Sequence, residues 1–88
     1  MTSLLIREYK VKLLMDRLIR ALATVAFLAD AGCYDAAFNL LETLDQIAMG
    51  LEMYLHPVYQ VARTMLLNYI QRTAETPGKW HYHENPPG

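Results

Sequence analysis

The chain has 88 residues, a formal net charge of −1 and a hydrophobic content of 53%. A chain of this length forms one domain at most, and such a domain buries only about 60–65% of the surface that its unfolded chain exposes. The near-neutral charge argues against nucleic acid as the main ligand. The longest mainly apolar stretch, 21–29, is far shorter than the roughly 20 residues of a membrane-spanning helix.

Cysteine content and the start of the chain bear on location. Cys33 is the single cysteine, so the chain cannot form an internal disulfide. A lone thiol is more typical of a reducing compartment. The sequence opens without the basic segment, apolar segment and cleavage site of a secretory signal. We therefore expect a cytoplasmic protein.

The first predicted helix runs from Ser3, which can serve as its N-cap, to Gly32, which can take the left-handed conformation that ends a helix. Apolar residues recur along it at intervals of three and four. These positions include Leu14, Leu18, Ala21, Leu22, Val25 and Leu28. Further apolar residues make its C-terminal half apolar nearly all round, which indicates burial on more than one side.

Two more helices are predicted after a tight turn. The second starts at Tyr34-Asp35 and is closed by Gly50, with one apolar and one polar face. The third starts at Pro57, because proline suits the first position of a helix. Its apolar stripe runs from Val58 to Ile70, and Thr76-Pro77-Gly78 stops it.

The predicted fold class is all-α: three antiparallel helices in a domain spanning 1–78, followed by a polar tail, 79–88, that we expect to be flexible. The helices carry more apolar surface than so small a domain can bury, and no disulfide compensates. Unburied apolar surface of this kind is typical of an interaction site. We therefore expect a protein-binding module.

Charge is unevenly distributed along the chain. Residues 1–20 contain five basic residues, whereas 21–56 contain five acidic residues and no basic one. One interpretation is that these are complementary, solvated helix faces within the fold. The other is that a basic helix steers an acidic partner.

The sequence offers little catalytic machinery. Acidic residues are scattered over polar helix faces, and Cys33, which we expect to be a small semi-buried thiol, has no base placed beside it by sequence. The pair His81 and His83 falls short of the four ligands of a closed zinc site. No phosphate-binding loop is present. We therefore expect no enzyme activity, no metal and no cofactor.

The most informative motif is Gly32-Cys33-Tyr34-Asp35-Ala36-Ala37. It resembles the helix-turn-helix of a tetratricopeptide repeat, in which a glycine ends one helix and Gly-x-Tyr-x-x-Ala opens the next. Glycine permits the sharp turn, Tyr34 fills the space beneath it, and the small Ala37 lets the helices approach closely. A generic helical hairpin is the competing interpretation, since no second copy is readable at the ~34-residue period of such repeats.

This corner, within 29–41, and the small size of the chain resemble the small chaperones of bacterial type III secretion that hold the needle subunit before export. The resemblance implies a heterotrimer of this chain, the amphipathic needle subunit and a second small helical co-chaperone. An apolar groove would mask the needle helix and prevent premature polymerisation. On repeat-like packing, the partner-binding residues would be Ile19, Leu22, Ala26, Val61 and Met65.

Two other functions remain open. A structural or regulatory homo-oligomer would bring the apolar faces together in a symmetric helical bundle. A small transcriptional regulator would use Arg7, Lys10, Arg17 and Arg20 on DNA, although the near-neutral overall charge speaks against it.

Overall fold

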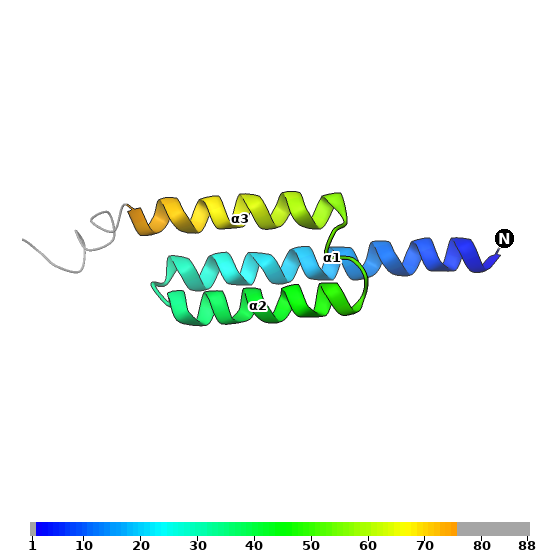
Figure 1. The fold of residues 1–88 in the computed structure, drawn as a ribbon, viewed down its shortest axis with the longest axis horizontal. Helices are drawn as coiled ribbons and strands as arrows, with labels where there is room; N and C mark the ends of the chain where they lie inside the picture. Colours follow the sequence, from blue (N-terminus) through cyan, green and yellow to red (C-terminus); the bar gives the residue numbers. More distant parts are fainter. Residues whose placement is uncertain (1, 76–88) are drawn as a thin grey trace, which may run out of the picture.

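The computed structural model describes residues 2–75, and their side chains from residue 6 onward. It contains three helices, α1 (Thr2–Asp30), α2 (Tyr34–Gly50) and α3 (Pro57–Glu75) (Figure 1). No strand occurs within 2–75, so the predicted all-α fold class is confirmed. The predictions for the tail, 79–88, including the histidine pair, lie outside the described residues.

Helix α1 lies between the other two helices and packs against both (Figure 1). The chain reverses at each connection, so α2 runs opposite to α1, and α3 runs in the same direction as α1. This course is compatible with the predicted antiparallel order of consecutive helices. Within the described residues α2 and α3 do not pack backbone against backbone. The arrangement is therefore open, with α1 as the common support.

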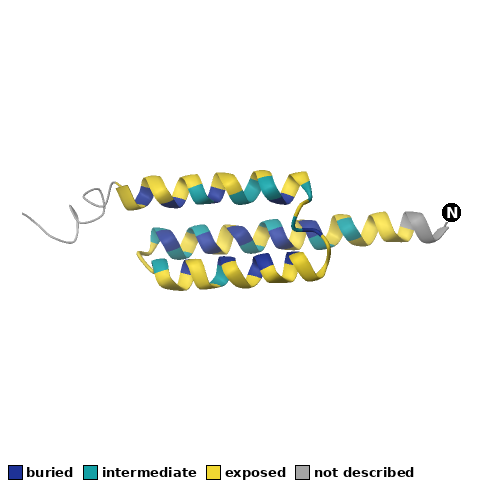
Figure 2. Cartoon of the chain, in the orientation of Figure 1, coloured by how far each residue is buried: buried dark blue, intermediate teal, exposed yellow. Residues whose placement is uncertain are grey.

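The core consists of residues spaced by three and four along each helix, because such residues share one helical face. The buried apolar side chains are Met15, Leu18, Leu22, Val25 and Ala29 of α1, Ala37, Leu41, Leu44 and Ala48 of α2, Met53 of the α2–α3 connection, and Tyr59, Leu66 and Ile70 of α3. Figure 2 shows these positions where the three helices overlap. With 29 residues, α1 is about 44 Å long, whereas α2 and α3 are about 26 and 29 Å long. The N-terminal part of α1 therefore extends beyond both.

The α1–α2 corner is a Schellman motif. The backbone N–H of Cys33 donates to the carbonyl of Leu28 (2.9 Å), and that of Gly32 donates to Ala29 (3.0 Å). Gly32 has φ +83°, a left-handed conformation that glycine adopts without steric cost. As the motif predicts, Ala37 is fully buried where the two helices meet. Cys33 is exposed, so the expectation of a semi-buried thiol is wrong.

The α2–α3 corner is also a Schellman motif, but a glutamate and not a glycine occupies its left-handed position. The N–H of Met53 donates to Ala48 (2.8 Å), and that of Glu52 donates to Met49 (3.0 Å). Glu52 occupies the left-handed position with φ +59°. Gly50, which the sequence suggested as the closing residue, is the last residue of α2 itself. The buried Met53 that follows anchors the turn in the core.

The sequence predicted the start of α3 correctly but not the start of α1. α3 begins at Pro57 as predicted, and the Nδ1 atom of His56 accepts a hydrogen bond from the N–H of Val58 (3.1 Å). The imidazole of His56 thus caps α3. α1 begins at Thr2, so Ser3 lies inside the helix and is not its N-cap.

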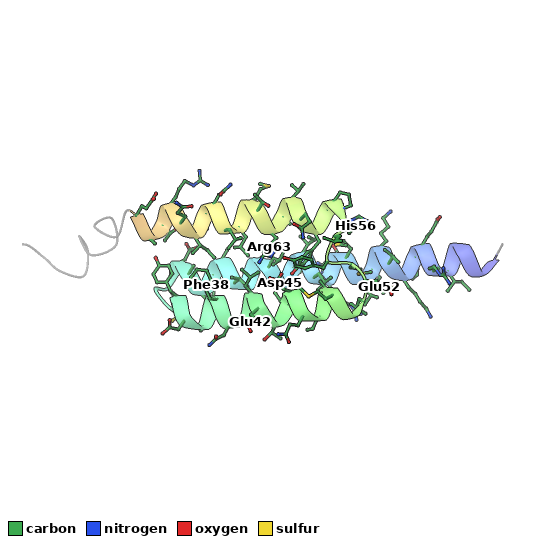
Figure 3. The ribbon with its side chains drawn as sticks, in the orientation of Figure 1. Phe38, Glu42, Asp45, Glu52, His56 and Arg63 are labelled. Atoms are coloured by element: carbon green, nitrogen blue, oxygen red, sulfur yellow. The ribbon has the colours of Figure 1, made fainter. Side chains whose placement is uncertain are left out.

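A polar cluster, here called the Asp45 bridge, joins α2 to α3 across the gap between their backbones (Figure 3). It consists of Asp45, Tyr59 and Arg63. The Tyr59 hydroxyl donates to Asp45 Oδ1 at 2.7 Å, and Arg63 donates from Nε at 2.9 and 3.0 Å and from Nη2 at 2.8 Å. Asp45 is only 8% exposed, but every polar atom in this contact is satisfied.

Candidate docking surface

The five predicted partner-binding residues do not share one environment. Val61 and Met65 are exposed, at 59% and 65% of their surface. Ile19 and Ala26 are half-buried beside the core. Leu22 is 4% exposed and belongs to the core, so its side chain is not available to a partner and the prediction fails at this position.

Two observations indicate which parts of the parallel helices α1 and α3 lie together. Val58, near the start of α3, lines a groove with Val11, Met15 and Ile19 of α1. Towards the other end of both helices, the Tyr69 hydroxyl donates to Asp30.

Four of the five predicted residues lie on these two helices without being fully buried. With Val58 they define a candidate surface that we call the α1–α3 seam: Ile19 and Ala26 of α1 and Val58, Val61 and Met65 of α3. A groove of about 540 Å³ lies beside Ile19 and Val58. The groove is lined by Arg7, Glu8, Val11, Lys12, Met15, Asp16 and Ile19 of α1 and by His56 and Val58. Apolar atoms make up most of its surface.

The exposed side of the seam is an apolar stripe on α3. Val58, Val61 and Met65 follow one another at spacings of three and four, so they share a helical face. Their exposed fractions are 50%, 59% and 65%. The sequence pattern merged this stripe with the core-facing one formed by Leu66 and Ile70. The structure separates the two faces by about a third of a helical turn.

Sequence reasoning missed Tyr59 and the Asp45 bridge. Tyr59 lies on the core-facing side of α3 with Leu66 and Ile70, and it is fully buried. Its hydroxyl and the Arg63 guanidinium lie one helical turn apart on α3, and both point at Asp45. The only sequence signal was a tyrosine and an arginine at i and i+4, which is too common to predict a contact with an aspartate 14 residues earlier.

The Asp45 bridge is structural in its chemistry. Burial and the hydrogen bond to Asp45 raise the pKa of Tyr59 far above its ordinary value. The hydrogen bond to Asp45 likewise raises the pKa of Arg63. Both groups therefore hold their protons at neutral pH and make poor general acids or bases. Within residues 6–75, no three histidine, cysteine, aspartate or glutamate side chains are grouped so that they could hold a metal ion.

The basic residues near the start of α1 are not neutralised by the acidic residues of α2. Arg20 pairs with Asp16 inside α1, at 3.1 Å on the surface. Arg7, Lys10, Lys12 and Arg17 have no ion-pair or hydrogen-bond partner among the described side chains. None of these four residues forms an ion pair with an acidic residue of α2.

None of the three described helices has the length and apolar content that crossing a membrane requires. Comparison of the chain with protein-family models, with curated proteins and with solved structures found no match.

Proposed function

We propose that the protein is a non-enzymatic binding module that covers an amphipathic helix of a partner along the α1–α3 seam. The observation that carries this proposal is the exposed apolar stripe Val58–Val61–Met65 beside the groove. Singly exposed apolar residues are ordinary on protein surfaces, but a continuous stripe bordering a hollow is typical of an interaction site.

The shape of the seam favours a helix as the bound element. Two parallel helices flank it, and its exposed residues repeat at the spacing of a helical face. A helix laid between them can place its own i, i+3, i+4 and i+7 side chains against this surface. An extended segment would leave its backbone groups without partners, because no sheet edge is present within 2–75.

The partner that we propose is the needle subunit of type III secretion, with this chain acting as its cytoplasmic chaperone. The support is the resemblance of the Gly32–Ala37 corner, where the positive φ of Gly32 and the burial of Ala37 fit the role that the motif gives to each residue. Binding would withdraw monomer from the polymerising pool by mass action. In the proposed heterotrimer, a second small helical co-chaperone completes the complex.

The test compares two seam variants, Val61→Asp and Met65→Asp, with the control Gln71→Asp on the same helix. All three positions are exposed, so the variants should fold alike, as checked by circular dichroism. We expect wild type and the control to delay polymerisation of purified needle subunit at equimolar concentration, measured by light scattering. Each seam variant should lose at least about tenfold in affinity, since a charge replaces an apolar contact.

Equal protection by all four proteins would contradict the proposal. A wild-type dimer in sedimentation velocity that Val61→Asp converts to monomer would instead favour the homo-oligomer, because the seam would then bind a second copy. Leu22→Asp is not a useful variant, since a charge at this buried position would unfold the core.

A further inference from the structure

Residues 6–17 of α1, here called the arm, extend beyond the helices that cover the rest of α1 (Figure 1). Val58 at the start of α3 lines a groove with residues of the arm, while the rest of α3 runs alongside the C-terminal part of α1 (Figure 1). Figure 2 shows the arm as mostly exposed. Within the arm, Met15 is buried, and Val11 and Leu14 pack against the core, whereas the side chains on its other faces are exposed.

The arm carries its own apolar stripe. Ile6, Tyr9 and Leu13 are spaced by three and four and are 50%, 68% and 38% exposed. This face is separate from the seam, because the groove is lined by Val11, Met15 and Ile19 on another side of the same helix. A second hollow, of about 330 Å³, lies where the arm passes the α2–α3 connection. The arm therefore has unfilled apolar surface on several sides.

Positive charge predominates in the arm. Lys10 lies one turn after Ile6, and Arg17 lies one turn after Leu13, so both border the apolar residues. With Arg7 and Lys12 they make four basic residues against the two acidic residues Glu8 and Asp16, a net charge of +2. The first turn of α1 contains no acidic residue, so the positive end of the helix dipole adds to this charge.

We infer that the arm is a second docking site, whose occupant is a partner helix that presents acidic residues beside an apolar stripe. Charge complementarity selects this occupant. Two arms would repel each other, since each carries a net charge of +2. The apolar stripe of the arm lies on a different face of α1 from the groove beside the seam, so this site does not depend on the function proposed for the seam.

The test uses the full chain and two synthetic helical peptides with the same leucine pattern, one with glutamates and the other with lysines beside the leucines. Fluorescence anisotropy measures binding. We expect the glutamate peptide to bind at least tenfold more tightly than the lysine peptide. Raising the salt concentration should weaken this binding, because exposed ion pairs are screened.

Two sets of variants localise the binding. Lys10→Gln with Arg17→Gln should weaken binding of the glutamate peptide about tenfold, since two exposed charge contacts are lost. The control, Asn39→Glu with Asn68→Glu, changes the net charge equally at exposed positions of α2 and α3 and should change affinity less than twofold. Tyr9→Ala with Leu13→Ala should also weaken binding at least tenfold, whereas Val61→Asp in the seam should not affect it.

Three results would overturn the inference. The first is equal affinity for the two peptides, and the second is unchanged affinity in both arm variants. The third is a wild-type dimer in sedimentation velocity that Glu42→Lys dissociates. Glu42 and Phe38 lie on the exposed face of α2 (Figure 3), so that result would show α2 of a second copy to be the occupant of the arm.

Discussion

Asp45 is the residue on which the relative position of α2 and α3 depends most directly. These helices share no backbone contact, and the carboxylate of Asp45 accepts hydrogen bonds from both Tyr59 and Arg63. Arg63 also lies 5.7 Å from the centre of the Tyr54 ring, a cation–π contact that limits its freedom. The carboxylate of Asp45 therefore provides a polar contact between α2 and α3 where their backbones do not pack together.

The same contact makes stability sensitive to alkaline pH. The pKa of Tyr59 is raised in the folded protein, chiefly by burial and then by the Asp45 hydrogen bond. The unfolded chain therefore loses the Tyr59 proton near pH 10 while the folded chain keeps it. Because the unfolded state then binds fewer protons, the free energy of unfolding should fall above pH 10, by up to about 1.4 kcal/mol per pH unit.

Urea unfolding of wild type and Tyr59→Phe between pH 7 and pH 11 checks this effect. The variant should be about 1 kcal/mol less stable at pH 7, because the hydrogen bond is lost. The difference in free energy of unfolding between wild type and variant should shrink above pH 10. Only the wild type is destabilised there, because only its unfolded chain loses a proton at position 59. Tyr9→Phe is the control, since Tyr9 is 68% exposed and its removal should leave the wild-type profile unchanged. A constant difference between wild type and Tyr59→Phe at all pH values would contradict the assignment.

At the scale of the elements, the two helix corners share a geometry but differ in their fit. Gly32 and Glu52 occupy equivalent left-handed positions, and only the glycine does so without strain. Glu52→Gly should therefore stabilise the protein by about 0.5–1 kcal/mol, measured as an increase in the urea midpoint.

At the α1–α2 corner, the matched substitution should lower the stability of the protein. Gly32→Ala should destabilise the protein by about 1 kcal/mol through backbone strain alone, since an added Cβ would meet no atom within 4 Å. If Glu52→Gly lowered the midpoint instead, the greater freedom of glycine in the unfolded chain would outweigh the relief of strain.

The sequence predicted the elements well where a local signal existed. Pro57 marked the start of α3, Gly32 marked the first corner, and apolar spacing located most of the core in α1 and α2. The prediction was weaker where tertiary contacts decide. Whether Val61 or Tyr59 faces the interior depends on how α3 is rotated about its axis, and the long-range contact between Tyr59 and Asp45 helps to set that rotation.

The candidate site was predicted in part for the same reason. Helix phase alone placed Ile19, Ala26, Val61 and Met65 on the proposed surface, and in the structure none of the four is fully buried. Leu22, which was placed with them, lies in the core. Helix phase does not show which side of α1 the other two helices cover, so it could not distinguish Leu22 from its neighbours.

At the scale of the whole molecule, the tertiary contacts of α1 are concentrated in its C-terminal half. The core part of α1 reaches from Met15 to Ala29, whereas the residues of the arm before Met15 have only half-buried contacts, at Val11 and Leu14. An isolated helix of about 12 residues is marginal in water. We therefore expect amides of the arm to exchange with solvent much faster than those of residues 18–29.

Hydrogen–deuterium exchange with mass spectrometry measures this difference. In the free protein, the arm should exchange at least about a hundredfold faster than the core part of α1, because it opens without disturbing the core. Saturating glutamate peptide should slow exchange in the arm and leave the core unchanged. Equal protection along all of α1 in the free protein would show that the arm is stabilised by contacts other than those described.

The position of α1 between its two neighbours also bears on the order of events during folding. Only three residues separate α1 from α2, whereas α3 reaches α1 through contacts such as Asp30–Tyr69, 39 positions apart. Since closing a short loop costs less entropy, we expect the α1–α2 hairpin to form before α3 docks onto it. In that interval the face of α1 that α3 covers would be exposed, and a helix from another chain would compete with α3 for it. The outcome of such a competition would depend on rates as well as affinities.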